Sequence, residues 1–324
     1  MTALAYVWRE PRTVLEVSGP DAAEFLQGQF TNDLSGAAEQ RPCVYGLWLD
    51  VKGRVLADAH VLRLDDERFL LFSFEVSAGV IRDRLEAYII ADEVDVADVS
   101  EAWAGWVVWG STAAAALETA GMDGEGAPDW GRFSRTSGGG FCFRSRDLGR
   151  AVASWHVVCP AAAQDEWGTR LANGHERDAD WLDWTRCRAG IPRVPREIGP
   201  TDLPNEAGLD AEAISYTKGC YLGQEVMARL KHLGQVRRRL YIVGVEGVDA
   251  AAAAALSLPA PLSPAEGGRA IGELRSLYPR EGGQTVGMAM LRTADAAPGA
   301  VLSIEGVPGG QVVVEAVAEG RAVP

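Results

Sequence analysis

The residues with the most chemical potential lie in the run Lys218-Gly219-Cys220-Tyr221-Leu222-Gly223-Gln224-Glu225, a glycine-rich turn that leads into a helical pattern. A neighbouring lysine and a helix start both favour a thiolate over a thiol, so Cys220 is a candidate nucleophile or transient metal ligand. The plain alternative is a small buried apolar residue, which most lone cysteines are. The two glycines either admit the close approach of a ligand or simply make the turn.

A second candidate lies in residues 55–62, where alternation with period two places Asp58 and His60 on one face of a predicted strand, with Leu56 and Leu62. A carboxylate there can accept protons or stabilise a developing cation, and a neighbouring imidazole can tune it, which suits general acid–base chemistry on a ligand nitrogen. The alternative is a solvated strand face.

A third candidate is Glu206, in the loop Leu203-Pro204-Asn205-Glu206-Ala207-Gly208-Leu209. Proline and glycine hold such a loop in one geometry. A carboxylate fixed in this way can accept two parallel N–H donors from one ligand, which gives orientation as well as affinity. The alternative is an acidic residue at a helix start.

The run from Lys218 to Glu225, with Val226-Met227-Ala228-Arg229 and Arg237-Arg238-Arg239-Leu240 after it, resembles the signature of the YgfZ family, folate-binding relatives of the glycine-cleavage T-protein that support iron–sulfur enzymes. Residues 25–34, with Lys52-Gly53-Arg54 and Asp58, are similar to the first lobe of the T-protein. The resemblance covers residues 22–64, 186–240 and, more weakly, 266–292.

The resemblance implies a role for each candidate. Asp58 matches the T-protein's catalytic aspartate, and Glu206 matches its pterin-binding glutamate. Cys220 and Lys218 are expected to be essential, and Lys218 contacts Asp58, the carboxylate tail of the ligand or nothing. The expected cofactor is tetrahydrofolate or a one-carbon derivative, bound by Glu206, Asp58, Arg229, Tyr221 and Gln224.

The basic residues after the motif are candidates for the glutamate tail of a folate, because guanidinium forks match carboxylates. They are Arg229, Lys231 and Arg237 to Arg239. Solvated charge is the alternative for each of them. One position departs from the T-protein: the run Arg186-Cys187-Arg188-Ala189 has an arginine where the T-protein has a glutamate. This reversal argues against the T-protein's own reaction, and Gly190-Ile191-Pro192 again favours the YgfZ side of the superfamily.

Composition limits the class of protein. The 324 residues are 47% hydrophobic, enough for a sizeable core in two or three units, and the net charge of −14 disfavours direct nucleic-acid binding. No run of about 18 apolar residues predicts a membrane span, and the start of the chain shows no secretory leader, so we expect a cytoplasmic protein. Five scattered cysteines without a CxxC spacing predict neither disulfides, nor a metal site, nor a resident cluster. No feature of the sequence fixes the oligomeric state.

The resemblance implies an α+β protein with the three-lobed T-protein arrangement around a central folate channel. We expect a first α+β lobe at 1–100, completed by 200–235, and a second at 101–199. The eight tryptophans between 103 and 184 are interpreted as part of the packed core of the second lobe. A small antiparallel β-barrel is expected at 236–324. Within the first lobe, residues 55–64 and 69–72 predict a hairpin, and 76–90 a helix. Residues 250–264 are either a loose connection or an alanine-rich helix.

The predicted function is that of a tetrahydrofolate-binding accessory factor for the assembly or repair of iron–sulfur proteins, including enzymes that thiolate transfer RNA. Its expected partners are folate and iron–sulfur proteins. One alternative is a folate-dependent aminomethyl or one-carbon transferase that uses Asp58. The other is a non-catalytic interaction scaffold that has kept the fold and lost the ligand.

Overall fold

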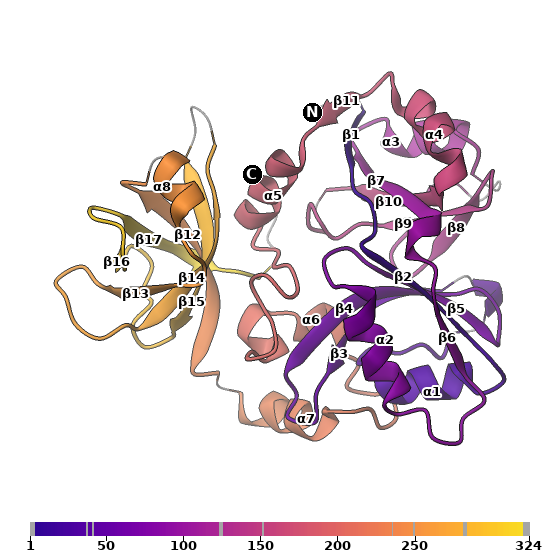
Figure 1. Cartoon of the computed structure of the whole chain (residues 1–324), viewed down its shortest axis with the longest axis horizontal. Helices are drawn as coiled ribbons and strands as arrows, with labels where there is room; N and C mark the ends of the chain where they lie inside the picture. The colour runs from indigo at the N-terminus through magenta and orange to yellow at the C-terminus, as the bar shows by residue number, and fades with distance from the viewer. Residues whose placement is uncertain are drawn as a thin grey trace.

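The computed structural model describes residues 4–36, 38–40, 42–122, 126–150, 152–234, 236–248, 250–280 and 284–319. Two β-sheets pack together on one side of the molecule, and a closed β-barrel lies on the other side, with helices and long loops between them (Figure 1). The predicted α+β class and the antiparallel C-terminal barrel are confirmed. Among the described residues, no helix is both long and apolar enough to cross a membrane.

The first sheet has five antiparallel strands in the order β3-β4-β5-β2-β6. Its strands are β2 (Thr13–Ser18), β3 (Cys43–Leu49), β4 (Val55–Arg63), β5 (Arg68–Ser73) and β6 (Asp95–Asp98), and its helices are α1 (Ala22–Gln29) and α2 (Ala78–Glu86). The predicted hairpin is therefore β4–β5, joined by the acidic turn at 65–67. The predicted helix at 76–90 is present but shorter: it runs from Ala78 to Glu86, and a turn follows at residues 87 and 88.

The second sheet has six strands in the order β11-β1-β7-β10-β9-β8. They are β1 (Ala5–Trp8), β7 (Trp103–Trp109), β8 (Phe133–Thr136), β9 (Gly140–Arg144), β10 (Ser154–Pro160) and β11 (His175–Arg177), with helices α3 (Ala113–Thr119) and α4 (Gln164–Leu171). Strand β1 pairs with β7 and β11, so the first residues of the chain belong to this sheet and not to the first one. The proposed division of the chain into a first lobe at 1–100 completed by 200–235, a second lobe at 101–199 and a barrel at 236–324 stays a prediction.

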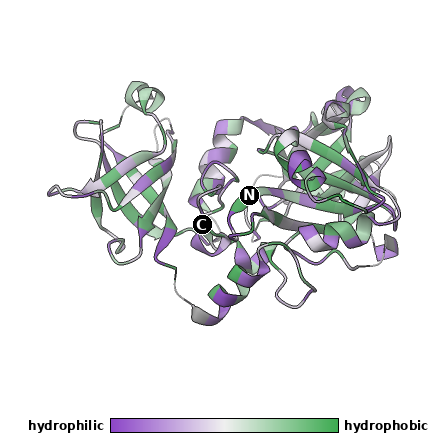
Figure 2. Cartoon of the chain, turned by 60° about the horizontal axis from the view of Figure 1, so that its bottom comes forward, coloured by the Kyte–Doolittle hydropathy of each residue, from purple (hydrophilic) through white to green (hydrophobic). Residues whose placement is uncertain are grey.

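The two sheets face each other across an apolar layer in which several phenylalanines pack among aliphatic side chains. From the first sheet, Leu62 and Phe72 enter this layer, and from the second sheet Phe141, Phe143 and Val158 meet them. Their burial follows from the alternation of strand side chains, since every second residue of β4 and β9 points to the partner sheet. Figure 2 shows hydrophobic residues along the strands of both sheets and of the barrel, whereas the helices carry residues of both kinds.

The barrel closes in the order β12-β15-β14-β13-β16-β17. Its strands are β12 (Arg238–Glu246), β13 (Ala260–Pro264), β14 (Gly272–Tyr278), β15 (Thr285–Arg292), β16 (Val301–Ile304) and β17 (Gln311–Val317). The alanine-rich passage, open in the sequence, forms helix α8 (Ala250–Ala255) and then β13. Helices α5 (Ala179–Arg188), α6 (Asp210–Ala213) and α7 (Gln224–Leu233) connect the barrel to the two sheets, as does the short 3-10 helix η4 (Pro204–Ala207).

A buried polar cluster fastens the barrel to the connecting segment. Arg186 of α5 donates to Glu197 at 2.8 and 3.0 Å and also bonds Tyr278 of β14, whose hydroxyl donates to Glu197 at 2.7 Å. The side chains of Arg186 and Glu197 are fully buried. Burial acts to raise the pKa of Glu197, but Arg186 outweighs it, and the pKa falls to about 2. The carboxylate is therefore ionised at neutral pH and holds three segments together.

Candidate functional site

Asp58 lies on β4 at the wall of an interior site formed with Tyr45 of the paired strand β3. The Tyr45 hydroxyl donates to Oδ2 of Asp58 at 3.0 Å. Burial raises the pKa of Asp58 to about 6, although Arg146 and the Tyr45 hydrogen bond favour the ionised form. A carboxyl with a pKa near neutrality can take up or release a proton under physiological conditions, which is what general acid–base chemistry requires.

Arg146 is the centre of this site and was not foreseen from the sequence. It follows β9, stacks on the Tyr45 ring with 4.4 Å between the guanidinium carbon and the ring centroid, and donates to the carbonyl of Pro192 at 3.2 Å. Its Nε and Nη2 both donate to Oε1 of Glu212, on α6. Arg146 thus joins the second sheet, the first sheet and the connecting loop at one point. The charged run 144–147, directly after the apolar strand, is the sequence signal that could have identified it.

Three cavities meet at Arg146. The largest, of 310 Å³, is lined by the loops at 190–192 and 207–212 and by Arg150 and Glu319. The second, of 150 Å³, extends between β3 and the second sheet, and a small third one reaches Asp58. Small-molecule sites occupy about 300–1,000 Å³. The largest of the three reaches the lower end of this range, and the small cavity at Asp58 shares Arg146 and Pro192 with it.

Behind Asp58 a chain of ion pairs crosses from one sheet to the other. Arg9, directly after β1, bonds Glu75 at 3.2 Å and Asp147 at 3.1 Å, and Arg193 also bonds Glu75. Burial acts to raise the pKa of Asp147, but Arg9 and other cations outweigh it and hold that pKa well below its usual range. Asp147 is thus ionised at neutral pH, in contrast to Asp58, whose pKa is raised toward neutrality.

His60 is buried in the layer between the sheets, so the alternative of a solvated strand face for residues 55–62 is wrong. Its ring packs against Tyr45 at 5.1 Å, Phe143 at 5.1 Å and His156 at 5.5 Å between centroids. Burial, with a further contribution from His156, lowers the pKa of His60 far below its usual value. The imidazole is neutral at physiological pH and acts as a packed, uncharged polar neighbour of the site.

Lys218 does not contact Asp58. Its Nζ donates three hydrogen bonds to the backbone carbonyls of Gln27, Phe30 and Asn32, at 2.7, 2.8 and 2.8 Å, where α1 ends. Burial lowers the pKa of Lys218 to about 8, and three carbonyls match the three N–H donors of the charged form. Lys218 therefore ties its loop to the end of α1, which supports a positioning role. Its predicted catalytic role stays a prediction.

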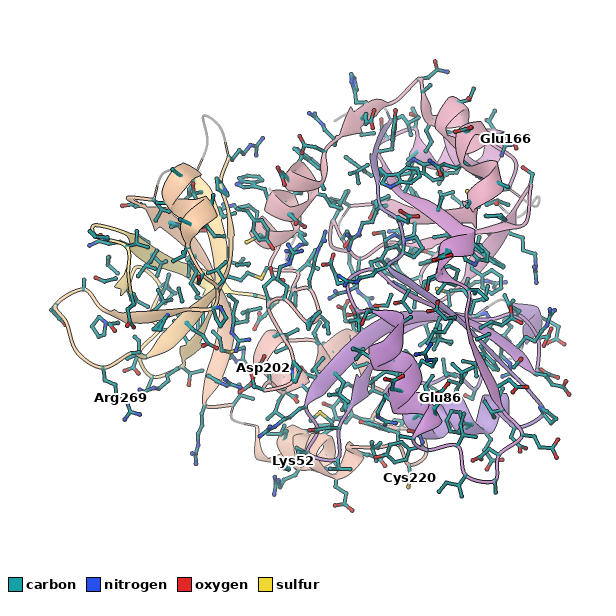
Figure 3. All side chains as sticks on the ribbon, in the orientation of Figure 1. Lys52, Glu86, Glu166, Asp202, Cys220 and Arg269 are labelled. Carbon is teal, nitrogen blue, oxygen red and sulfur yellow. The ribbon has the colours of Figure 1, made fainter. Side chains whose placement is uncertain are left out.

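Cys220 is exposed on the outer edge of the first sheet's half of the molecule, in the loop before α7 (Figure 3). The loop is fixed where α7 begins, because Gly223 has φ +86° and a Cβ there would lie 2.9 Å from the carbonyl oxygen of Asp50. Gly219 has open space instead, since a Cβ at that position would meet no atom within 4 Å. Glycine at 223 is thus required by close approach, and glycine at 219 is not.

The other motif residues lie near Cys220 and away from Asp58. Tyr221 is buried, Gln224 is the first residue of α7, and Arg229 is exposed on that helix. None of the three lines the cavities that meet at Arg146, as far as the described residues go. The structure therefore separates the sequence-predicted site into an outer group around Cys220 and an inner group around Asp58. Cofactor contacts by Tyr221, Gln224 and Arg229 stay predictions.

Glu206 lies in a third place, on η4 against the barrel. Arg238 donates to its Oε1 at 2.7 Å and to its Oε2 at 3.1 Å, and the backbone N–H of Leu203 donates to Oε2 at 2.8 Å. Both carboxylate oxygens are thus engaged, and Asp202 shares the same arginine at 2.9 Å. The alternative of an acid at a helix start describes this geometry, and binding of a pterin by Glu206 stays a prediction that requires the Arg238 pair to open.

The cations predicted for a glutamate tail are also spread out. Arg238 is held by Glu206 and Asp202, and Arg239 pairs with Glu319 at 3.1 Å. Arg188, where the T-protein has an acid, pairs with Glu315 of the barrel at 2.6 Å. Across the described ranges, no three His, Cys, Asp or Glu side chains gather where they could hold a metal ion.

Comparison with known proteins agrees with this architecture. The chain belongs to the family of the GCVT N-terminal domain, whose model matches residues 12–215. It is 31% identical over 296 residues to the mouse protein named iron-sulfur cluster assembly factor IBA57, mitochondrial, covering 87% of this chain and 76% of the relative. It is 30% identical over 232 residues to the Edwardsiella ictaluri protein named tRNA-modifying protein YgfZ, covering 70% and 67%.

Among solved structures, the glycine cleavage system aminomethyltransferase T from Bartonella henselae superposes with a TM-score of 0.78 and 20% identity, over 100% of this chain and 88% of that one. At this identity the likeness shows the fold. The expected T-protein-like arrangement, with two α+β lobes and a C-terminal barrel, is thereby confirmed, as is the resemblance to the YgfZ family.

Proposed function

We propose that this protein is a tetrahydrofolate-binding accessory factor that supports the assembly or repair of iron–sulfur proteins, with tRNA-thiolating enzymes among those it serves. The names of its relatives support this, since one group is named for iron–sulfur cluster assembly and the other for tRNA modification. The observation that carries the folate part is the cavity at Arg146, where two carboxyl groups, an arginine and a tyrosine converge.

The residues present fit a reduced pterin. Its amino group and ring N–H are parallel donors that a carboxylate accepts together, and Glu212 and Asp58 supply carboxylates to two cavities that share Arg146. Both bonds from Arg146 go to Oε1 of Glu212, so within the described residues Oε2 has no hydrogen bond of its own. In the described part of the chain, Glu212 therefore keeps one oxygen free for a pterin donor, whereas both oxygens of Glu206 are already engaged.

When bound, tetrahydrofolate supplies nitrogen atoms that carry one-carbon units. The protein's own contribution is to orient the ligand and to hold or accept its protons. Arg146 fixes Glu212 against the loop at Pro192, and Tyr45 fixes Oδ2 of Asp58. With its pKa at about 6, Asp58 is mostly ionised at pH 7 and can accept a proton from a ligand nitrogen.

We assign to the exposed thiol of Cys220 the contact with the iron–sulfur protein that this factor serves. It lies on the outer surface, whereas the other four cysteines are buried. An exposed thiol on a rigid loop can reach an iron–sulfur protein or its cluster, and Lys218 and Gly223 make the loop rigid. The client protein and its cluster are then the cargo, and the interior cavity holds the folate.

Complementation tests this function. An Edwardsiella ictaluri strain that lacks its YgfZ protein receives the wild-type chain, Cys220→Ala or the control Thr217→Ala, an exposed neighbour in the same loop. We expect wild type and Thr217→Ala to restore iron–sulfur enzyme activity and tRNA thiolation, and Cys220→Ala to fail. The proposal is sunk if Cys220→Ala restores both as well as wild type and the purified protein shows no saturable folate binding.

A folate-dependent one-carbon transferase is a second candidate, favoured by the pKa of Asp58 at about 6 and by its Tyr45 hydrogen bond. Formation of methylenetetrahydrofolate from an aminomethyl donor, abolished by Asp58→Asn, would establish it. The interaction scaffold without a ligand predicts a different result: a melting temperature that does not move at saturating tetrahydrofolate, since ligand binding to the native state must raise it.

A further inference from the structure

The 150 Å³ cavity beside Arg146 is lined by four arginines, Arg132, Arg144, Arg146 and Arg150. The lining contains a single acidic residue, Glu212, which Arg146 already engages. Such an excess of guanidinium groups in one concave place is unusual in a chain of net charge −14. It produces a local field that attracts anions.

Two of these arginines are held by stacking. Arg144 and Arg150 lie 5.0 and 4.9 Å from the ring of Trp130, and Arg144 also lies 4.8 Å from the ring of Trp155. Stacking fixes the plane of a guanidinium and leaves the N–H fork at its edge able to bind. The buried Nε of Arg144 has no hydrogen-bond partner within the described residues, and Asp129 is the acid that acts on this arginine.

His60 gives a second, independent sign of a ligand. Its side chain is 5% exposed, it lines both this cavity and the small one at Asp58, and its Nε2 has no hydrogen-bond partner among the described residues. A buried polar atom without a partner costs about 1–3 kcal/mol, and a bound polar group removes that cost. The cavity therefore offers a neutral imidazole as well as the guanidinium forks.

The arginine cavity borders the larger one and shares part of its wall. Arg146, Arg150 and Glu212 line both. A ligand that fills the 310 Å³ cavity can thus extend past Arg150 toward Arg132, which lines only the smaller cavity. The occupant best matched to this path is a flexible chain that carries one carboxylate after another.

We propose that the arginine cavity binds the γ-linked glutamates of a polyglutamylated folate, so that this protein selects long-tailed folates. This inference rests on the proposed function, and it places the glutamates beyond the first at Arg132, Arg144 and Arg150 rather than at Arg229, Lys231 and Arg237 to Arg239. Each added glutamate brings one more carboxylate, and charge-assisted guanidinium–carboxylate pairs are among the strong hydrogen bonds.

The test is calorimetric titration with tetrahydrofolate carrying one glutamate and with tetrahydrofolate carrying three. We expect wild type to bind the triglutamate about tenfold more tightly, as one or two partly exposed charged pairs allow. Arg132→Ala is expected to remove this preference and to leave monoglutamate binding unchanged. The matched control is Arg135→Ala, an exposed arginine on β8 that does not line the cavity.

Each outcome decides something. Equal affinity for both folates in wild type overturns the inference and leaves folate binding intact. A preference that persists in Arg132→Ala overturns the assignment to this cavity. Absence of binding for both folates overturns the proposed function together with the inference. Free γ-triglutamate and inorganic phosphate complete the set: tighter binding of phosphate than of triglutamate would assign the cavity to a phosphate ligand instead.

Discussion

Replacement of Lys218 by methionine separates a positioning role from a chemical one. Methionine keeps the length of the side chain and removes the three N–H donors. The carbonyls of Gln27, Phe30 and Asn32 then lose a charged partner at the end of α1. An unsatisfied buried polar group costs about 1–3 kcal/mol, and water reaches part of this helix end, so we take about 1 kcal/mol for each carbonyl. The expected loss in the free energy of unfolding is about 3 kcal/mol.

Urea denaturation measures this loss. With a slope of about 3 kcal/mol per molar, the midpoint should fall by about 1 M in Lys218→Met. The matched control is Lys231→Met on α7, an exposed lysine 4.0 Å from the ring of Tyr216, where the expected loss is below about 1 kcal/mol. Hydrogen exchange should also quicken in residues 27–32 and 217–222 of the Lys218 variant alone. Equal urea midpoints for the two variants would show that the three hydrogen bonds of Lys218 do not stabilise the end of α1. A chemical role would then be the remaining explanation for Lys218.

Two other perturbations follow from the buried charges. Tyr45→Phe removes a hydrogen bond that favours the ionised form of Asp58. The pKa of Asp58, followed by NMR of its carboxyl carbon, should therefore rise above the wild-type value of about 6. An unchanged or lower pKa of Asp58 would contradict this role of the Tyr45 hydroxyl. Arg186→Leu leaves Glu197 buried without its cation and should cost about 3–5 kcal/mol in urea denaturation, whereas Arg68→Leu, at an exposed pair, should cost less than about 1 kcal/mol.

Acid stability follows from the same cluster. The pKa of Glu197 is lowered from 4.5 to about 2 in the folded protein, so the unfolded chain binds more protons between these values. The stabilisation from Glu197 is therefore complete above about pH 5 and is lost as the pH falls toward 2. The contribution of Asp58 to stability changes with pH in the opposite direction. Because its pKa is raised in the folded protein, its ionisation reduces the free energy of unfolding as the pH rises from about 4 to 6.

Local patterns in the sequence predicted much of the fold. Alternation over residues 55–62, closed by the acidic turn at 65–67, predicted the β4–β5 hairpin, and short strands between glycine-rich turns predicted the barrel. The same alternation put Asp58 and His60 on one face. It could not show whether water or another sheet covers that face, because the covering strands β9 and β10 are distant in sequence.

The centre of the site depends on contacts that no local pattern encodes. Arg146 and Glu212 are 66 positions apart, and Lys218 reaches carbonyls 186 to 191 positions away. Strand β1 reads as an ordinary alternating strand, and only pairing with β7 assigns it to the second sheet. The sequence therefore supplied the groups with chemical potential, and tertiary packing decided which of them meet.

The claim at the centre of this account is that the cavity at Arg146 binds tetrahydrofolate through Glu212. Calorimetric titration of the purified protein with tetrahydrofolate tests it, with Glu212→Gln as the variant and Glu86→Gln, an exposed glutamate on α2, as the control. We predict saturable binding at one site in wild type and control, weakened at least about tenfold in Glu212→Gln because a carboxylate that pairs with the pterin is lost. No saturable heat in wild type, or equal affinity in all three proteins, would contradict the account.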